Sequence, residues 1–238
     1  MLFRLSLTAI ALACLGSFAS PAATLTAGSN ASAISASFVV NGKAGALAPQ
    51  ALASGSAPPA YSKATSVPSL SKSQQFDILT LTGTGKNIKD TATGTAVTLG
   101  KITSKAGASI GSLTGTVGSP LGNVLTITGT KLVSSAGLAK TADKNTPTGT
   151  VSIGSLSINA PAFGISNKSY SGKPKPNFIL YQSGDKKVTL YLNRQIKTTK
   201  SGKVTKISVS AVNLHIVDLE TSGQTISGDL FLATGNAH

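Results

Sequence analysis

Apolar and polar side chains alternate most clearly between residues 188 and 196. Val188, Leu190, Leu192 and Ile196 are predicted to lie on one face of an extended strand, and Thr189, Tyr191, Asn193 and Gln195 on the other. A period of two is typical of a strand with one buried and one solvated face. Because a second apolar run and a Ser-Gly-Asp turn precede this strand, residues 177–195 are predicted to form a β-hairpin.

Two other segments also show strand patterns. Residues 32–42 alternate and end in Asn-Gly, which predicts a strand followed by a tight turn. In residues 203–220 the apolar positions shift from Val209 to Val212 and Leu214. Such a shift predicts a β-bulge, or a strand that is covered on both faces. No segment after the N-terminal region shows a helical period with capping residues.

Short Thr, Val and Ile segments separated by glycine fill residues 76–159. Thr126 and Thr128 are spaced as in a lattice that binds ice or chitin, but the neighbouring segments look out of register with them. We therefore expect ordinary threonines on the solvent side of antiparallel strands. The uneven spacing of the Thr-Gly-Thr tripeptides argues against a repeat of fixed length. These tripeptides begin at Thr82, Thr93, Thr114, Thr128 and Thr148.

Residues 43–73 are rich in Ala, Pro and Ser and show little periodicity. They are predicted to form a long loop, either as extended chain lying over a sheet or as a mobile segment. Polyproline character is expected at Pro58 and Pro59. A structureless run of this length is unusual inside a compact domain.

These patterns together predict an all-β fold of short strands joined by tight turns. An antiparallel β-sandwich or a jelly-roll-like body fits best, as a single domain over residues 23–238. The composition agrees, because only 12% of the 238 residues are charged and Gly, Ser, Thr and Ala are abundant. A chain of this length buries roughly 70% of its unfolded surface, which is enough for a stable core.

The first 22 residues have the three parts of a secretory signal. Arg4 precedes an apolar stretch from Leu5 to Phe18, and small residues predict cleavage after Ala19 or Ala22. The only cysteine, at position 14, lies inside this segment, so the mature chain is expected to have no disulfide. The predicted location is secreted or at the cell surface, with the periplasm as an alternative. No transmembrane segment is predicted in the mature chain.

Few side chains in the sequence suit catalysis. There are seven carboxylates and two histidines, one of which is the last residue, His238, where a frayed end is expected. Asp218 and Glu220 would emerge in parallel from one strand, with His215 on its other face, and such carboxylates do not flank a substrate. Metal-binding spacings and a complete phosphate-binding loop are missing. The sequence therefore predicts no enzyme, no metal site and no cofactor.

The formal charge of +14 favours anionic partners. Lysines interleaved with tyrosines between residues 168 and 206 predict a surface for an acidic polysaccharide, the cell envelope or extracellular nucleic acid. The alternative is that these lysines solvate turns and guard strand edges. The predicted binding residues are Lys173, Lys175, Lys186, Lys187, Arg194, Lys197, Lys200, Lys203, Lys206, Tyr181 and Tyr191.

Four stretches of the sequence carry a family resemblance. They are "ASFVVNGKAGALAP", "PNFILYQSGDKKVTLYLNRQ", "VNLHI" and "GDLFLATGNAH". Together they resemble the choice-of-anchor P family of bacterial secreted and surface proteins. The resemblance implies an exported β-domain with no catalytic residues to transfer. The matching polar positions are Asn193, Asn213 and His215, for which buried hydrogen bonding is expected.

Three functions remain open from the sequence. The first is a secreted or cell-surface structural or adhesive protein, which could also self-associate. The second is a binding module for anionic polymers that uses the lysine-rich hairpin surface. The third is an enzyme of unknown type. The sequence ends at "ATGNAH" with no sorting motif, so the protein is expected to be released or held non-covalently.

Overall fold

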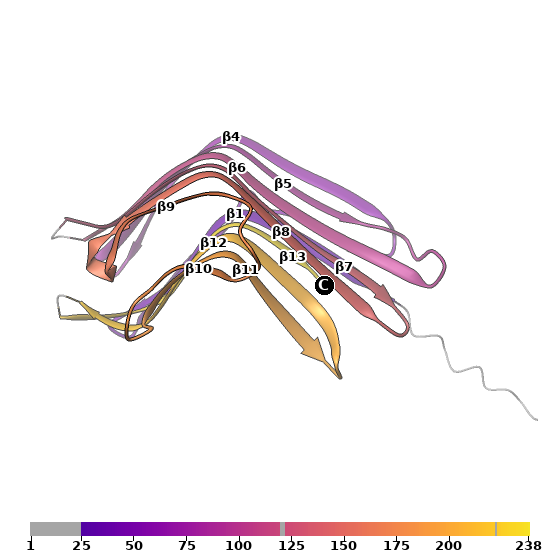
Figure 1. Cartoon of the computed structure of the whole chain (residues 1–238). Helices are drawn as coiled ribbons and strands as arrows, with labels where there is room; N and C mark the ends of the chain where they lie inside the picture. Colours follow the sequence, from indigo (N-terminus) through magenta and orange to yellow (C-terminus); the bar gives the residue numbers. More distant parts are fainter. Residues whose placement is uncertain (1–24, 120–121, 222) are drawn as a thin grey trace, which may run out of the picture.

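Two antiparallel sheets stack face to face and form a β-sandwich (Figure 1). The computed structural model describes residues 25–119, 122–221 and 223–238. The predicted signal peptide lies outside these residues. In the described part, the one helical element is a single 3-10 turn at Pro161–Phe163. The prediction of an all-β fold is confirmed.

The seven-stranded sheet has the order β10-β11-β12-β13-β1-β2, and β3 pairs with β1 beside β2. Four of its strands follow one another along the chain, as expected for a meander rather than for the Greek keys of a jelly roll. Its strands are β1 (Ala27–Val40), β2 (Lys43–Gln50), β3 (Ala53–Ala57), β10 (Phe178–Gln182), β11 (Val188–Lys200), β12 (Lys203–Thr221) and β13 (Gln224–Ala237).

The six-stranded sheet runs in chain order from β4 to β9. Strands that follow one another in the chain therefore lie side by side, and the edge strands β4 and β9 each pair with a single neighbour. This sheet supplies the convex outer surface of the sandwich (Figure 1). Its strands are β4 (Tyr61–Phe76), β5 (Leu79–Gly94), β6 (Lys101–Ser119), β7 (Gly122–Thr141), β8 (Asn145–Ala160) and β9 (Ile165–Gly172).

The prediction of a loop at residues 43–73 is wrong. The segment forms β2, β3 and most of β4, and β4 pairs along its whole length with β5. Both β2 and β4 lie at sheet edges, and most of their residues are exposed or half-buried. Their sequences therefore lack the regular alternation of apolar and polar residues that predicts a strand. Pro68 is compatible with β4 because an edge strand has backbone N–H groups that need no ladder partner.

Both sheets bend sharply in the middle, and the bend changes which residues face inward (Figure 1). In β6 the inward positions are even-numbered up to Ile110 and odd-numbered from Leu113. In each sheet, residues with positive φ lie at the bend in alternate strands. They are Asn87 in β5 and Lys131 in β7, on either side of β6, and Asn193 in β11 and Ala233 in β13, on either side of β12. The bend is therefore one feature shared by all the long strands.

The predicted shift of apolar phase in β12 belongs to this bend. Pairing continues in register from Ser210 with Thr234 to Val212 with Leu232, so no bulge interrupts it. Residues 209–214 are all buried, so β12 is buried on both faces here, as in the second predicted alternative. The other sheet covers only one of these faces. The partner strand β13 bends at the same row, which keeps the two strands paired.

Threonines on the outer face of the six-stranded sheet lie in register. Pairing places Thr82, Thr116 and Thr126 in one row across three strands, and the Thr82 and Thr116 hydroxyls lie 2.6 Å apart. The next row contains Thr84, Thr114 and Thr128. The expectation that these segments are out of register was wrong, because register depends on turn lengths that the sequence pattern does not show. Their placement on the solvent side is confirmed.

Candidate functional site

The predicted basic residues do not form one patch. Lys186 and Lys187 lie in the turn between β10 and β11, whereas Lys200 and Lys203 lie at the opposite end of β11. A strand of this length separates the two groups by roughly 40 Å. Lys173 and Lys175 lie in the connection from β9 to β10, near the middle of β11.

The β11–β12 hairpin meets lysines that are distant in the sequence. Lys203 Nζ donates to the Ala142 carbonyl oxygen at 2.6 Å, and Asn145 Nδ2 donates to the Val204 carbonyl oxygen at 2.8 Å. The turn between β7 and β8 therefore lies against this hairpin, at the right of Figure 1. We call the resulting group of lysines the basic end: Lys101, Lys140, Lys144, Lys197, Lys200, Lys203 and Lys206.

His238 lies within the basic end and is not frayed. Its backbone N–H donates to the Gly28 carbonyl oxygen at 2.8 Å, and Ser104 Oγ donates to its carbonyl oxygen at 3.3 Å. Burial lowers the pKa of the His238 imidazole, and the positive charges of Lys140 and Lys206 lower it further. The imidazole therefore lies close to the positive charges of this end.

The carboxylates of the described residues lie mostly at the other end of the sandwich. This far end contains the turns after β1, β4, β10 and β12, to the left in Figure 1. Asp77 pairs there with Lys43 at 3.0 Å. A hydrogen bond from Ser183 and the N–H of Lys187 lower the pKa of Asp185, which shapes the predicted hairpin turn. In the described chain, the basic end contains a single acidic side chain, that of Asp143.

The predicted residues Arg194 and Tyr191 lie in the middle of β11, away from both ends, opposite Ser210 and Asn213 of β12. Tyr191 alternates with the buried Leu190 and Leu192, so it faces the outer side of the seven-stranded sheet. This outer side is concave (Figure 1). The Arg194 guanidinium carbon lies 4.0 Å from the centre of the Tyr191 ring. The Nε of Arg194 is buried and has no acceptor in the described structure. Arg194 and Tyr191 therefore belong to a different surface from the lysines. Tyr181, in β10, lies on the other face of the sheet, where it packs against the core with its hydroxyl beside Gly164.

A polar cluster lies beside Tyr191 on the concave face. Asp229 Oδ1 accepts from His215 Nδ1 at 3.0 Å and from Asn213 Nδ2 at 2.9 Å. The expected buried hydrogen bonding is confirmed for Asn213 and for Asn193, which donates to the Pro174 carbonyl oxygen at 2.9 Å. The sequence reasoning missed Asp229, because only the pairing of β12 with β13 brings it beside His215.

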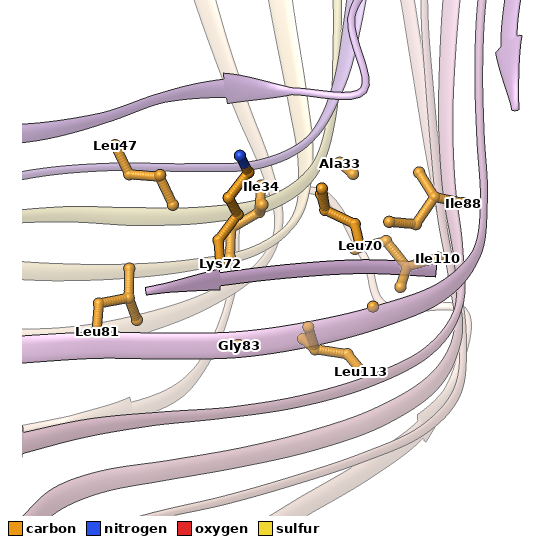
Figure 2. Close-up of a pocket in the computed structure, with 11 residues that line it drawn as sticks. Ala33, Ile34, Leu47, Leu70, Lys72, Leu81, Gly83, Ile88, Ile110 and Leu113 are labelled. Atoms are coloured by element: carbon orange, nitrogen blue, oxygen red, sulfur yellow. The ribbon is translucent and has the colours of Figure 1, made fainter. Parts of the chain in front are cut away.

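A small apolar cavity opens between the two sheets at the edge formed by β2 and β4 (Figure 2). Its volume of about 20 Å³ is room for roughly one water molecule. Leu47 of β2 and Leu70 of β4 line the cavity. Gly83 of β5 also lines it and contributes no side chain to fill it. Lys72 lies among these side chains, and a lysine turned inward on an edge strand discourages pairing with another chain.

Asp90 is a buried carboxyl group between the sheets. It is 0% exposed, and neither carboxylate oxygen has a hydrogen-bond partner of good geometry. Burial raises its pKa to about 7, and the backbone N–H groups of Ser109 and Ala33 act in the opposite direction. The described structure offers it no acidic, basic or nucleophilic partner, so it is an isolated ionisable group in the core.

The described residues contain few groups of side chains suited to catalysis or metal binding. No three His, Cys, Asp or Glu side chains in this part lie close enough to hold a metal ion. His215 pairs with a carboxylate, but no serine or threonine hydroxyl in the described structure bonds to its ring. None of these residues forms a helix of the length and apolarity that crossing a bilayer requires.

No family model and no curated protein matches this sequence. Among solved structures, the chain is similar to the crystal structure of Ail, the attachment invasion locus protein of Yersinia pestis. The sequences are 7% identical, and the alignment covers 90% of this chain and 97% of Ail at a TM-score of 0.19.

Proposed function

We propose that this protein is an exported, non-catalytic β-sandwich that adheres to anionic polymers of the cell envelope or its surroundings through the basic end. One observation carries the proposal. Lysines from β6, the β7–β8 turn and the β11–β12 hairpin converge at one end, and most of the carboxylates lie elsewhere. Export rests on the signal-like residues 1–22.

The chemistry of the basic end fits a polymer better than a small ligand. Its lysines are exposed except for Lys140, which is half-buried and donates to the Thr26 carbonyl oxygen at 2.8 Å. Exposed ammonium groups attract a polyanion by releasing its counterions, without a shaped pocket. Lysine recognises phosphate or sulfate as a point charge, whereas arginine would provide bidentate geometry. The expected binding is therefore broad in specificity and sensitive to salt.

The test is retention on immobilised heparin, a model polyanion, as salt is raised. The quadruple variant Lys144→Gln, Lys200→Gln, Lys203→Gln, Lys206→Gln is expected to elute at much lower salt and to show a shallower salt dependence. The matched control removes the same charge elsewhere through Lys72→Gln, Lys86→Gln, Lys186→Gln and Lys187→Gln. Equal loss in the two variants would show that net charge, and not the basic end, governs retention.

A separate experiment tests export. The full chain produced in a bacterial host is expected to appear outside the cytoplasm with an N-terminus after Ala19 or Ala22. A chain lacking residues 1–22 is expected to stay in the cytoplasm. Full-length protein that stays in the cytoplasm with its N-terminal residues intact would contradict the exported role and leave the binding test unaffected.

A further inference from the structure

We propose that the concave face of the seven-stranded sheet contains a binding subsite for one uncharged sugar ring of a glycan. The subsite consists of Tyr191, Asn213, Phe231, His215 and Asp229. It is distinct from the basic end and would give the protein a second, sugar-specific contact.

Strand pairing places these side chains in two adjacent rows. Tyr191, Asn213 and Phe231 form one row across β11, β12 and β13. Thr189, His215 and Asp229 form the next row. Three strands span roughly 10 Å and adjacent rows on one face are about 7 Å apart, which is the scale of a single sugar ring. The rings of Tyr191 and Phe231 flank the amide of Asn213.

The polar groups of the subsite are held in place by one another. Asn213 is only 2% exposed, and its amide and the His215 ring both donate to Oδ1 of Asp229. Oδ2 of Asp229 has no hydrogen-bond partner among the described residues. The side chains of Asp229 and His215 are 30% and 41% exposed, so a ligand can reach them. A carboxylate oxygen oriented in this way accepts hydrogen bonds from sugar hydroxyls.

The position of the subsite on the fold also favours binding. The six-stranded sheet covers the other face of these strands, so the side chains of the subsite point away from the core. The bend makes this outer face concave (Figure 1). The polar side chains of Asn213, Ser210 and Thr234 are buried on it, although no third layer covers them. A concave surface whose polar groups are already ordered loses little freedom when a ligand binds.

The charge of the subsite selects an uncharged sugar. Asp229 presents a carboxylate to the ligand and would repel an acidic sugar at close range. Arg194 is stacked over Tyr191 at 4.0 Å, so its guanidinium is occupied by the ring and covers one side of it. A ring of the ligand would therefore pack against Phe231 and the exposed edge of Tyr191, with its hydroxyls on Asp229 and His215.

The experiment is calorimetric titration with short neutral oligosaccharides of glucose, mannose, galactose and N-acetylglucosamine. It is done at high salt, where binding by the basic end is suppressed. At least one series is expected to bind. Asp229→Ala and Phe231→Ala should each weaken binding by about tenfold or more. The matched control Ser208→Ala, further along the same face, should bind as the unaltered chain does.

A second readout separates binding from a structural role. Ligand addition should shift the NMR signals of the His215 ring in the unaltered chain, which a residue with only a structural role would not show. The quadruple lysine variant described above should keep full sugar binding, so the two proposals fail independently. Absence of binding to every oligosaccharide series, or equal binding by the Asp229→Ala variant when folded, would overturn the subsite.

Discussion

The ammonium group of Lys203 donates a hydrogen bond to the carbonyl oxygen of Ala142, 2.6 Å away and 61 residues earlier in the chain. This contact joins the β11–β12 hairpin of one sheet to the β7–β8 turn of the other. It also brings Lys144 to the same surface as Lys200. A single side chain thus helps to gather the charges that the proposed function requires.

Replacing Lys203 with glutamine removes this contact, and we expect the β11–β12 hairpin to open more often. The lost hydrogen bond is at the surface, so global stability should fall by no more than about 1 kcal/mol. Backbone amides near the hairpin tip should exchange faster in hydrogen-exchange measurements. Lys200→Gln removes the same charge without the bond and should leave exchange unchanged. Equal protection in the two variants would contradict this role.

Asp90 is expected to make stability depend on pH. Its folded-state pKa of about 7 is higher than the ordinary value of 3.8, so the folded protein holds the proton more tightly than the unfolded chain. The free energy of unfolding should therefore be highest below pH 3.8, decrease as the pH rises toward 7, and be constant at higher pH. The total fall is at most about 4 kcal/mol. Chemical denaturation across this range measures it.

The variant Asp90→Asn should abolish most of that fall. An asparagine cannot ionise, and its size is close to that of the protonated carboxyl group. We expect the variant to be more stable than the unaltered chain above neutral pH and similar to it in acid. Asp185→Asn, an exposed turn carboxylate, is the control and should leave the pH profile through this range in place.

Gly83→Ala should stabilise the protein. A methyl group at this position would enter the small cavity at the β2–β4 edge, and its nearest neighbour would be the Thr114 carbonyl oxygen at 3.7 Å, an ordinary contact. The substitution also reduces the freedom of the unfolded chain. An increase of roughly 0.5–1 kcal/mol in the free energy of unfolding is expected. A decrease would show that the cavity cannot accept the added methyl group.

Gly235→Ala should have the opposite effect. This glycine lies where β13 approaches the six-stranded sheet most closely, and an added Cβ would be 2.8 Å from the Ala106 carbonyl oxygen. Because the neighbour is backbone in a paired strand, the two sheets would have to separate. We expect a loss of roughly 1–3 kcal/mol from overpacking. Thermal unfolding of the two glycine variants, measured side by side, tests both expectations.

Retention on heparin should increase as pH falls from neutral to mildly acidic values. The pKa of His238 is lowered by burial and by the neighbouring lysines, so the imidazole is neutral near pH 7 and gains its charge in acid. Protonation of His238 adds positive charge to the basic end. A bound polyanion would in turn stabilise the protonated imidazole. His238→Gln should reduce the increase. An unchanged pH profile in that variant would exclude this contribution.

The hairpin at residues 177–195 was predictable because its alternation and turn residues are local signals. Val188, Leu190 and Leu192 are fully buried as expected, and the turn forms at Ser183 with Asp185 as its hydrogen-bond acceptor. Ile196 is 43% exposed, against the prediction, because it lies beyond the bend, where the inward positions change parity. Edge strands gave no such signal. In β2 and β4, pairing with a neighbour and not an apolar face decides the conformation, so their Ala, Ser and Pro composition suggested a loop.

The candidate sites depend on distant pairings that composition does not reveal. Lys140 and Lys144 join the basic end only because β7 and β8 turn beside β12. Asp229 meets His215 only because β13 pairs with β12 in one particular register. The rows of threonine were missed for the same reason. Charge and residue type indicated the kind of partner, and only the fold showed where it could bind.

The shared bend has a consequence for how the lengths of the strands can change. The bend divides each long strand into two arms. One residue added within an arm would move the buried side chains of the rest of that arm to the solvent face, so insertions there must have an even number of residues. At the bend itself, inward and outward positions already change parity in every long strand. Single-residue insertions and deletions are therefore best tolerated along this line, and each arm of the sandwich can lengthen independently of the other.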